Sequence, residues 1–429
     1  MKICREVPAL VLVAAATLLA AAAPVPAQDM KKKDGVEKQD KREPNPLKKE
    51  EEAETQERGG VSGPWGRLLE QSELKGYVEG HYNSPESGSM SSRAPARADL
   101  HRLVLGLEYA FTDLLKFEIE VEFEHGGEEI EIEEAFLEYQ YTPEIAFQAG
   151  GLLLPMGLIN NDHIPTRFYS VERPYVDHSL IPTTWMEPGV GAVAQLPDDG
   201  LFAWLYLVGG LEAEGFTALD GIRGGRGAGR DSKADDLAIL ARVVYSPLQD
   251  PRLTFEGMAP PPDPALSFGG SFYWGEADQA VPALEGVEVL LVEGDVRFQA
   301  LGFDLRGQFV RTRVADSDKA SLFTGQTIGE VMQGGYVEAA YHLLWLLLPS
   351  DVQDLADDVA IFARYENIDT HMRVASGFAR NPAADREIWI TGVAYSPIPK
   401  VVFKADLEFW EDGLGRTVTR FNLGVGLVF

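Results

Sequence analysis

The last segment of the chain alternates between apolar residues and small or polar residues. One parity carries Phe421, Leu423, Val425, Leu427 and Phe429, and the other carries Asn422, Gly424 and Gly426. Because successive side chains of a strand point to opposite faces, this pattern predicts a strand with one apolar face. An apolar outer face and a terminal aromatic residue are typical of a transmembrane β-barrel, and an edge strand of a soluble sandwich is the alternative.

Strand-like segments of the same kind recur from residue 74 onward. In residues 117–124 every odd position is apolar and every even position is Glu. The segments start near Leu74, Leu100, Leu115, Ile130, Ile145, Gly189, Leu201, Leu237, Leu266, Val287, Phe303, Tyr336, Val359, Ile388, Val401 and Thr419. We therefore expect an all-β, transmembrane antiparallel barrel of about sixteen strands. A soluble barrel with inverted faces would show the same alternation.

The connections between these segments differ in length on the two sides of the predicted barrel. Short turns at residues 112–113, 142–144, 197–200 and 396–399 follow even-numbered segments. Long connections at 83–99, 155–188, 212–236, 315–334 and 370–386 follow odd-numbered ones. Short turns on one side and long loops on the other are typical of outer-membrane barrels. The connections at 247–264 and 349–358 are too long for the side with short turns. A count of about fourteen or eighteen strands is therefore the alternative to sixteen.

The N-terminal residues predict export. Lys2 and Arg5 precede an apolar run at residues 9–23, and the small residues Val25 and Ala27 suit cleavage before Gln28. We therefore expect a signal peptide over residues 1–27, which contains the only cysteine, Cys4. The charged residues 28–70 predict a flexible periplasmic tail, with a short helix or coiled-coil arm as the alternative. Residues 71–429 then form the barrel.

The predicted strand count bears on function, because about sixteen strands leave an aqueous channel whereas about eight are filled by side chains. Aromatic residues gather near the strand ends, where an interface girdle is expected: Tyr109, Phe111, Tyr139, Tyr141, Tyr245, Tyr395, Phe409 and Trp410. No segment of the sequence has the ~20 consecutive apolar residues of a membrane helix. In lipid the chain would therefore have to be a closed barrel.

The connection at residues 155–188 is the longest, and its prolines and charges predict a stiff constriction loop that folds into the lumen. The alternative is a loop that caps the outside. Inward parity places five cations in the lumen, and the loop supplies two more: Lys116, Arg242, Arg306, Arg364 and Lys404, with Arg167 and Arg173. These seven are the candidate pore-lining, solute-binding residues. Many carboxylates share their parity, and the formal net charge is 38 − 67 = −29.

Two segments resemble the phosphate-selective porin O and P family. They are residues 134–139 (EAFLEY) and 150–158 (GGLLLPMGL), and residues 168–173 and 187–192 are similar to the next segments of that family. The resemblance spans roughly residues 130–211. It implies an outer-membrane porin of about sixteen strands, usually a homotrimer, in which lumenal Arg and Lys side chains select phosphate.

We expect from these observations a porin of the bacterial outer membrane for passive diffusion of small charged solutes, phosphate or other anions among them. Its partners would be outer-membrane lipid, lipopolysaccharide and small inorganic or organic ions, with no nucleic acid, cofactor or metal and no catalytic residues. A lipase-like barrel enzyme and a structural or adhesive barrel are the alternatives. His342 and His371 are available to an enzyme, but no Gly-x-Ser-x-Gly segment is present.

Overall fold

The computed structural model describes residues 71–90, 95–160, 162–227, 233–248, 264–343 and 358–429. The predicted signal peptide (1–27) and tail (28–70) lie outside the described residues. So do most residues of the two long connections at 247–264 and 349–358.

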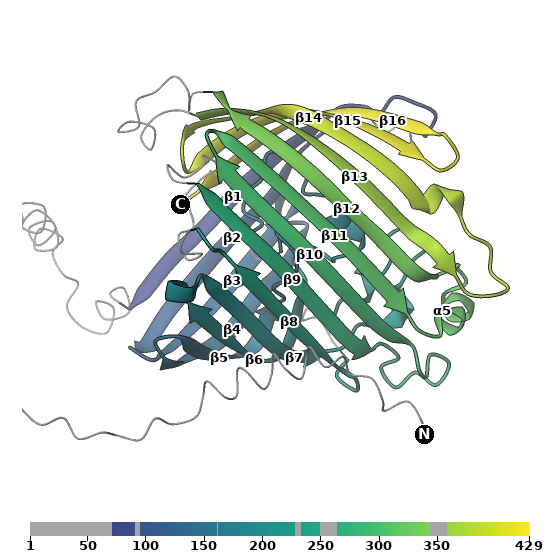
Figure 1. Ribbon diagram of the computed structural model, residues 1–429, viewed down its shortest axis with the longest axis horizontal. Coiled ribbons are helices and arrows are strands. Elements are labelled where there is room, and N and C mark those ends of the chain that lie inside the picture. The colour runs from purple at the N-terminus through teal and green to yellow at the C-terminus, as the bar shows by residue number, and fades with distance from the viewer. Residues whose placement is uncertain (1–70, 91–94, 161, 228–232, 249–263, 344–357) are drawn as a thin grey trace, which may run out of the picture. The chain divides into compact units, whose positions relative to one another are not determined.

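The described chain forms one closed antiparallel barrel of sixteen strands, in which each strand pairs with its sequence neighbours (Figure 1). The strands are β1 (Ser72–Asn83), β2 (Arg97–Thr112), β3 (Leu115–Glu124), β4 (Glu129–Thr142), β5 (Ile145–Leu153), β6 (Met186–Leu196), β7 (Leu201–Gly209), β8 (Leu237–Tyr245), β9 (Ala265–Glu276), β10 (Glu288–Ala300), β11 (Phe303–Val314), β12 (Gly329–His342), β13 (Asp358–Val374), β14 (Asp385–Ile398), β15 (Val401–Asp412) and β16 (Thr417–Val428). Strand β1 closes the barrel against β16, with Tyr77 opposite Val428. The predicted count of sixteen is confirmed, although β12 begins at Gly329 rather than near Tyr336.

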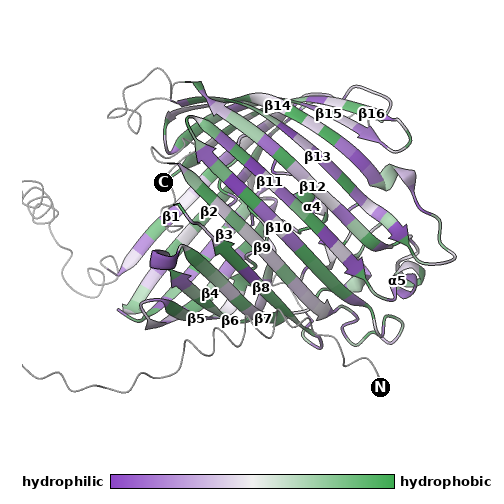
Figure 2. Ribbon diagram, viewed as in Figure 1, coloured by the Kyte–Doolittle hydropathy of each residue, from purple (hydrophilic) through white to green (hydrophobic). Residues whose placement is uncertain are grey.

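The strands turn apolar side chains outward. Phe421, Leu423 and Val425 of β16 are exposed on the outer surface, whereas Asn422 between them is fully buried. Figure 2 shows hydrophilic and hydrophobic residues alternating along the strands. Because only one face of each strand is apolar and exposed, the barrel offers lipid a hydrophobic outer surface.

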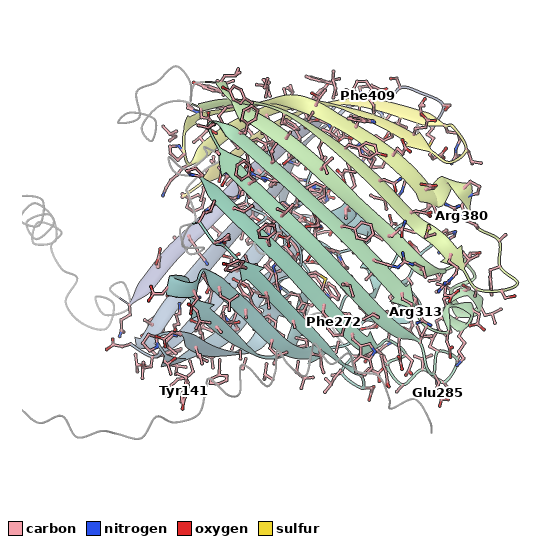
Figure 3. All side chains as sticks on the ribbon, in the orientation of Figure 1. Tyr141, Phe272, Glu285, Arg313, Arg380 and Phe409 are labelled. Atoms are coloured by element: carbon pink, nitrogen blue, oxygen red, sulfur yellow. The ribbon has the colours of Figure 1, made fainter. Side chains whose placement is uncertain are left out.

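Most of the predicted girdle residues follow this outward pattern. Tyr141 and Phe409 are exposed and lie at the margin of the barrel in Figure 3. Trp410 is the exception, because its ring packs inside the barrel against Tyr175, with ring centroids 4.4 Å apart. The girdle prediction was therefore wrong for Trp410.

Short helices occur only in the connections of the described chain. They are η1 (His125–Gly127), α4 (Val176–Ser179), η2 (Pro197–Asp199), η3 (Ala213–Gly215), η4 (Arg223–Gly225), α5 (Ser317–Thr324) and η7 (Pro382–Ala384). Among the described residues, no helix has the length and apolar character needed to cross a membrane.

Two irregularities in the strand pairing turn extra side chains inward. Between β1 and β2, Glu79 pairs with Arg102 and Gly80 pairs with Leu100, so His101 is an inserted residue. Between β3 and β4, Glu120 pairs with Glu134 and Val121 pairs with Ile132, so Glu133 is inserted. An inserted residue interrupts the alternation, so that two consecutive side chains can point to the same face of the sheet. Parity alone therefore did not predict that both Glu133 and Glu134 face the interior.

Candidate functional site

The long connection between β5 and β6, residues 154–185, lies against the inner face of the barrel; we call it the inner loop. The backbone N–H of Leu158 donates to Gln308 of β11 at 2.8 Å. The N–H of Val171 donates to Asp406 of β15 at 2.6 Å, and that of Val176 to Glu366 of β13 at 3.0 Å. The inner loop therefore contacts strands on the side of the barrel opposite to its own anchor points.

The inner loop packs an apolar core against one part of the barrel wall. Leu180, Ile181 and Trp185 are fully buried, and they belong to one cluster with apolar inner-face residues of β7–β14. The Trp185 ring lies 4.8 Å from that of Tyr273. We call the inner faces of β8–β14 the apolar half; they also carry buried charged side chains, which are described below. Close packing of the apolar side chains leaves no room for water between them.

Arg364 and Lys404, two of the predicted lumenal cations, hold the backbone of the inner loop. Arg364 donates from Nε to Glu366 at 2.8 Å and from Nη1 to Glu338 at 3.2 Å. Its guanidinium also donates to Ser170 Oγ at 2.6 Å and to the carbonyl of Glu172 at 3.3 Å. Lys404 Nζ donates to the carbonyl of Ser170 at 3.0 Å. Both cations are almost fully buried.

Arg306 of β11 and Arg242 of β8 are also paired with carboxylates on the inner face. Arg306 donates to Asp304 at 2.7 Å and to the carbonyl of Arg167 at 2.9 Å. Arg242 lies 2.8 Å from Asp295 and 3.1 Å from Glu293. The structure thus places these arginines on the inner face, buried beside carboxylates.

The remaining three candidate residues are less enclosed. Lys116 is partly exposed and lies 3.4 Å from Glu138. Arg167 lies 3.5 Å from Asp162. Arg173 has two buried nitrogens, Nε and Nη2, that make no hydrogen bond within the described part of the chain. Of the seven candidates, Arg173 therefore has the most unused donor capacity.

The inner faces of β1–β4 have a different character, and we call them the acidic half. Glu79, Glu118, Glu120, Glu122, Glu124, Glu133 and Glu134 lie there, against the cations Lys75 and Arg102. Arg102 lies 3.2 Å from Glu122. Lys75 pairs with Glu118 and lies 3.1 Å from Glu120. Glu134 has no ion-pair partner among the described residues.

The inner loop leaves a cavity of about 530 Å³ beside the acidic half. Lys75, Glu120 and Glu134 line it from the barrel wall, and Asp162 and Arg167 line it from the inner loop. Apolar surface comes from Phe136, Leu152, Trp204 and Tyr206, among others. The lining thus combines three carboxyl groups and two cations with aromatic surface.

The inner loop touches the acidic half at two points. His163 Nε2 lies 2.6 Å from Glu133, and Glu172 lies 3.4 Å from His81 Nδ1. Both histidines are nearly buried. The inner loop is therefore in direct contact with this wall at these two points, and open space lies beside them.

The two histidines considered for an enzyme have other partners. His342 Nδ1 lies 2.7 Å from Asp358, and its Nε2 lies 2.9 Å from the Tyr169 hydroxyl. His371 Nε2 lies 2.9 Å from the carbonyl of Thr327, and its Nδ1 accepts from the N–H of Asn381 at 3.0 Å. Neither ring contacts a serine hydroxyl within the described residues.

A comparison with known sequences identifies a relative. An uncharacterized protein of Aquifex aeolicus (strain VF5) is 32% identical over 354 residues, which cover 78% of this chain and 74% of that protein. The chain therefore belongs to the same family as the Aquifex protein. No protein-family model matches the chain. The finer resemblance to the phosphate-selective porin O and P family stays a prediction.

Solved structures with the same fold come from several bacteria. The outer membrane channel DcaP of Acinetobacter baumannii has a TM-score of 0.52 and 15% identity, over 83% of this chain and 97% of that chain. OprB of Pseudomonas putida has a TM-score of 0.53 and 11% identity, over 86% and 98%. OmpF of Salmonella typhi has a TM-score of 0.50 and 12% identity, over 83% and 97%. At such low identity the likeness shows the fold alone, and that fold is the predicted transmembrane antiparallel barrel.

Proposed function

We propose that this protein is an outer-membrane porin that lets small charged solutes diffuse between the inner loop and the acidic half of the barrel. The observation that carries the proposal is the uneven lining of the interior. The apolar half is packed against the inner loop, whereas the cavity of about 530 Å³ lies beside the carboxylates of the acidic half. A barrel of about sixteen strands is wide enough to keep an aqueous path beside such a loop.

The inner loop acts in this proposal as the constriction. Its contacts with the acidic half, His163 with Glu133 and Glu172 with His81, would border the path on the side where the inner loop meets the wall. Fixed charges at a constriction act strongly on passing ions, because low-dielectric walls surround them. The charges of these side chains would therefore set selectivity.

Two sets of charges oppose each other along this path. Carboxylates such as Glu120 and Glu134 favour cations, and Arg167 on the same cavity favours anions. Because the carboxylates outnumber the nearby cations, we expect an open channel that prefers cations. Phosphate or another anion would bind at the loop arginines Arg167 and Arg173. The buried Arg242, Arg306, Arg364 and Lys404 would serve mainly to hold the inner loop and its wall.

The assembly and surroundings follow from the fold and the resemblance. The exposed apolar outer face suits outer-membrane lipid, and the long connections would meet lipopolysaccharide. We expect a homotrimer, as the resemblance to the phosphate-selective porin O and P family implies.

Planar-bilayer recording tests the proposed function. Barrel folded in detergent and added to a bilayer should produce stepwise ion currents whose reversal potential in a salt gradient indicates preference for cations. Folded protein that inserts but conducts no ions would contradict the proposal and would favour the structural or enzymatic alternatives.

A further inference from the structure

Three of the seven histidines of the chain lie together near the long-loop end of the acidic half. His81 comes from β1, His101 is the inserted residue of β2, and His125 begins the short helix η1 after β3. Asp99 of β2 lies beside two of them. The irregular pairing of β1 with β2 brings His101 into this group, because simple alternation would not place both His101 and Arg102 inside.

The distances in this group suit a metal ion. Asp99 Oδ2 lies 2.6 Å from His125 Nδ1 and 3.8 Å from His101 Nδ1. Zinc bonds to nitrogen and oxygen ligands are about 2.0–2.2 Å, so ligand atoms around a tetrahedral ion lie about 3.3 Å apart. The two observed distances lie on either side of that value. Movements of less than about 1 Å would therefore bring the three atoms around one ion.

The ring orientations support the same pair of histidines. The His101 and His125 rings have centroids 5.6 Å apart and an interplanar angle of 74°. An ion close to the plane of both rings, at about 2.0–2.1 Å from each nitrogen, would put the centroids at a little over about 5 Å. His81 does not fit, because its ring is stacked on His101 at 4.2 Å and 13°. Two nearly parallel stacked rings cannot both point a nitrogen lone pair at one ion.

We propose that Asp99, His101 and His125 form a binding site for a divalent transition-metal ion of the zinc class. Imidazole nitrogens with one carboxylate are ligands that such ions prefer. Three protein ligands leave at least one position for water or for another ligand. The site is independent of ion conduction, because it needs only the fold of β2, β3 and η1.

Neighbouring charges would modulate the affinity of this site. Arg102 Nη2 lies 3.0 Å from His101 Nε2, so ion binding through Nδ1 requires Arg102 to turn toward Glu122, which already lies 3.2 Å from it. Protons compete with the metal for the imidazole nitrogens, so metal binding should weaken as the pH falls.

Calorimetric titration with Zn²⁺ tests the proposal on the untagged barrel folded in detergent. We expect one Zn²⁺ bound per chain, with affinity at least about tenfold lower in both His101→Gln and His125→Gln. His125 is largely exposed, so His125→Gln should fold normally even if His101→Gln does not. His178→Gln is the control, because His178 is partly exposed and lies on α4, outside the proposed group; it should bind Zn²⁺ as the parent does.

A second readout keeps the test specific. Cu²⁺ bound to the parent barrel should give an electron paramagnetic resonance spectrum with nitrogen ligands, and His125→Gln should lose one of them. Equal Zn²⁺ affinity in the parent and in folded His125→Gln would overturn the proposal. Because binding is measured in detergent, a barrel that binds Zn²⁺ without conducting would refute the proposed channel function and leave this site standing.

Discussion

The apolar half and the acidic half of the barrel interior are built from the same kind of strand, yet only the acidic half borders open space in the lumen. On the apolar half, residues such as Leu240, Leu291 and Ile390 are fully buried in the same cluster as Leu180, Ile181 and Trp185 of the inner loop. On the acidic half, Glu120 and Glu134 border a cavity. Burying apolar surface stabilises the folded barrel by about 25 cal/mol per Å² removed from water.

The two halves have different roles: one holds the inner loop in place, and the other lines the open space. The apolar half fixes the inner loop, with Arg364 bonded to its backbone, and Lys404 of the adjacent strand β15 bonds to that backbone as well. The acidic half leaves charged side chains beside the remaining space. A loop anchored on one wall can narrow the lumen at a defined distance from the other wall. Variants that alter one half at a time can therefore separate the two tasks.

Removing the part of the inner loop between residues 162 and 175 should have the largest effect. Single-channel conductance should rise roughly twofold or more, because the deletion removes the contacts of His163 and Glu172 with the acidic half. Planar-bilayer recording measures this. Deleting residues 376–379, in the connection between β13 and β14, is the matched control and should leave conductance unchanged. Equal conductance of the two deletion variants would refute the constriction.

Replacing Arg364 should destabilise the barrel through its apolar half. Arg364→Met leaves Glu366 buried without an ion-pair partner and Glu338 with only Arg306, 3.8 Å away, which costs about 3–5 kcal/mol. Arg373→Met is the control on the same strand, because Arg373 is exposed and pairs with Glu330; it should cost at most about 1 kcal/mol. Urea unfolding of both variants in detergent provides the comparison. Similar midpoints for the two would mean that Arg364 does not anchor the inner loop.

The sequence predicts the strands well because alternation is a local property. The strand β3 alternates strictly between apolar residues and Glu from Phe117 onward, and both its limits and its inward carboxylates follow from that pattern. The packing of the inner loop against the apolar half is harder to predict from the sequence. Strand β8 reads LAILARVVY, which is apolar on both faces except for Arg242. Continuous apolar runs indicate strands buried on both faces, and this signal could have located the packing of the inner loop.

The partners of the candidate cations could not be predicted in the same way. Parity places Arg306 and Arg364 on the inner face, but their partners come from other strands and from the inner loop. The inserted residues His101 and Glu133 also depend on the pairing of two strands. Such long-range contacts are set by the three-dimensional register rather than by local periodicity.

Neutralising the acidic half should reduce preference for cations. The double variant Glu120→Gln and Glu134→Gln keeps side-chain size and replaces two carboxyl groups of the cavity wall by amides. The ratio of cation to anion permeability, taken from the reversal potential, should fall roughly twofold. The control is Asp318→Asn with Glu285→Gln, two exposed residues whose charges are screened within about 10 Å at 0.1 M salt. A larger shift from the control pair would contradict a path along the acidic half.

Removing the loop arginines should shift selectivity in the opposite direction and by less. Arg167→Ala with Arg173→Ala should make the channel more selective for cations and should weaken any block of chloride current by phosphate. The expected change is smaller because Asp162 already lies 3.5 Å from Arg167. Reversal potentials and phosphate titrations in the bilayer measure both effects. Unchanged values would show that these arginines do not contact passing ions.

Thiol modification in a conducting bilayer tests the central claim most directly, namely that the solute path runs along the acidic half. The only cysteine of the chain is Cys4, so one introduced cysteine can be modified selectively once the predicted signal peptide is removed. Gln148 lies on the cavity, on β5 directly beside the acidic half, where it donates to Glu138 of β4 at 2.8 Å. Thr312 lies fully buried in the apolar half. Gln148→Cys and Thr312→Cys therefore place one thiol on the proposed path and one away from it. We predict that a charged methanethiosulfonate reagent reduces the current through Gln148→Cys and leaves Thr312→Cys unaffected. Block at Thr312→Cys with none at Gln148→Cys would contradict the account.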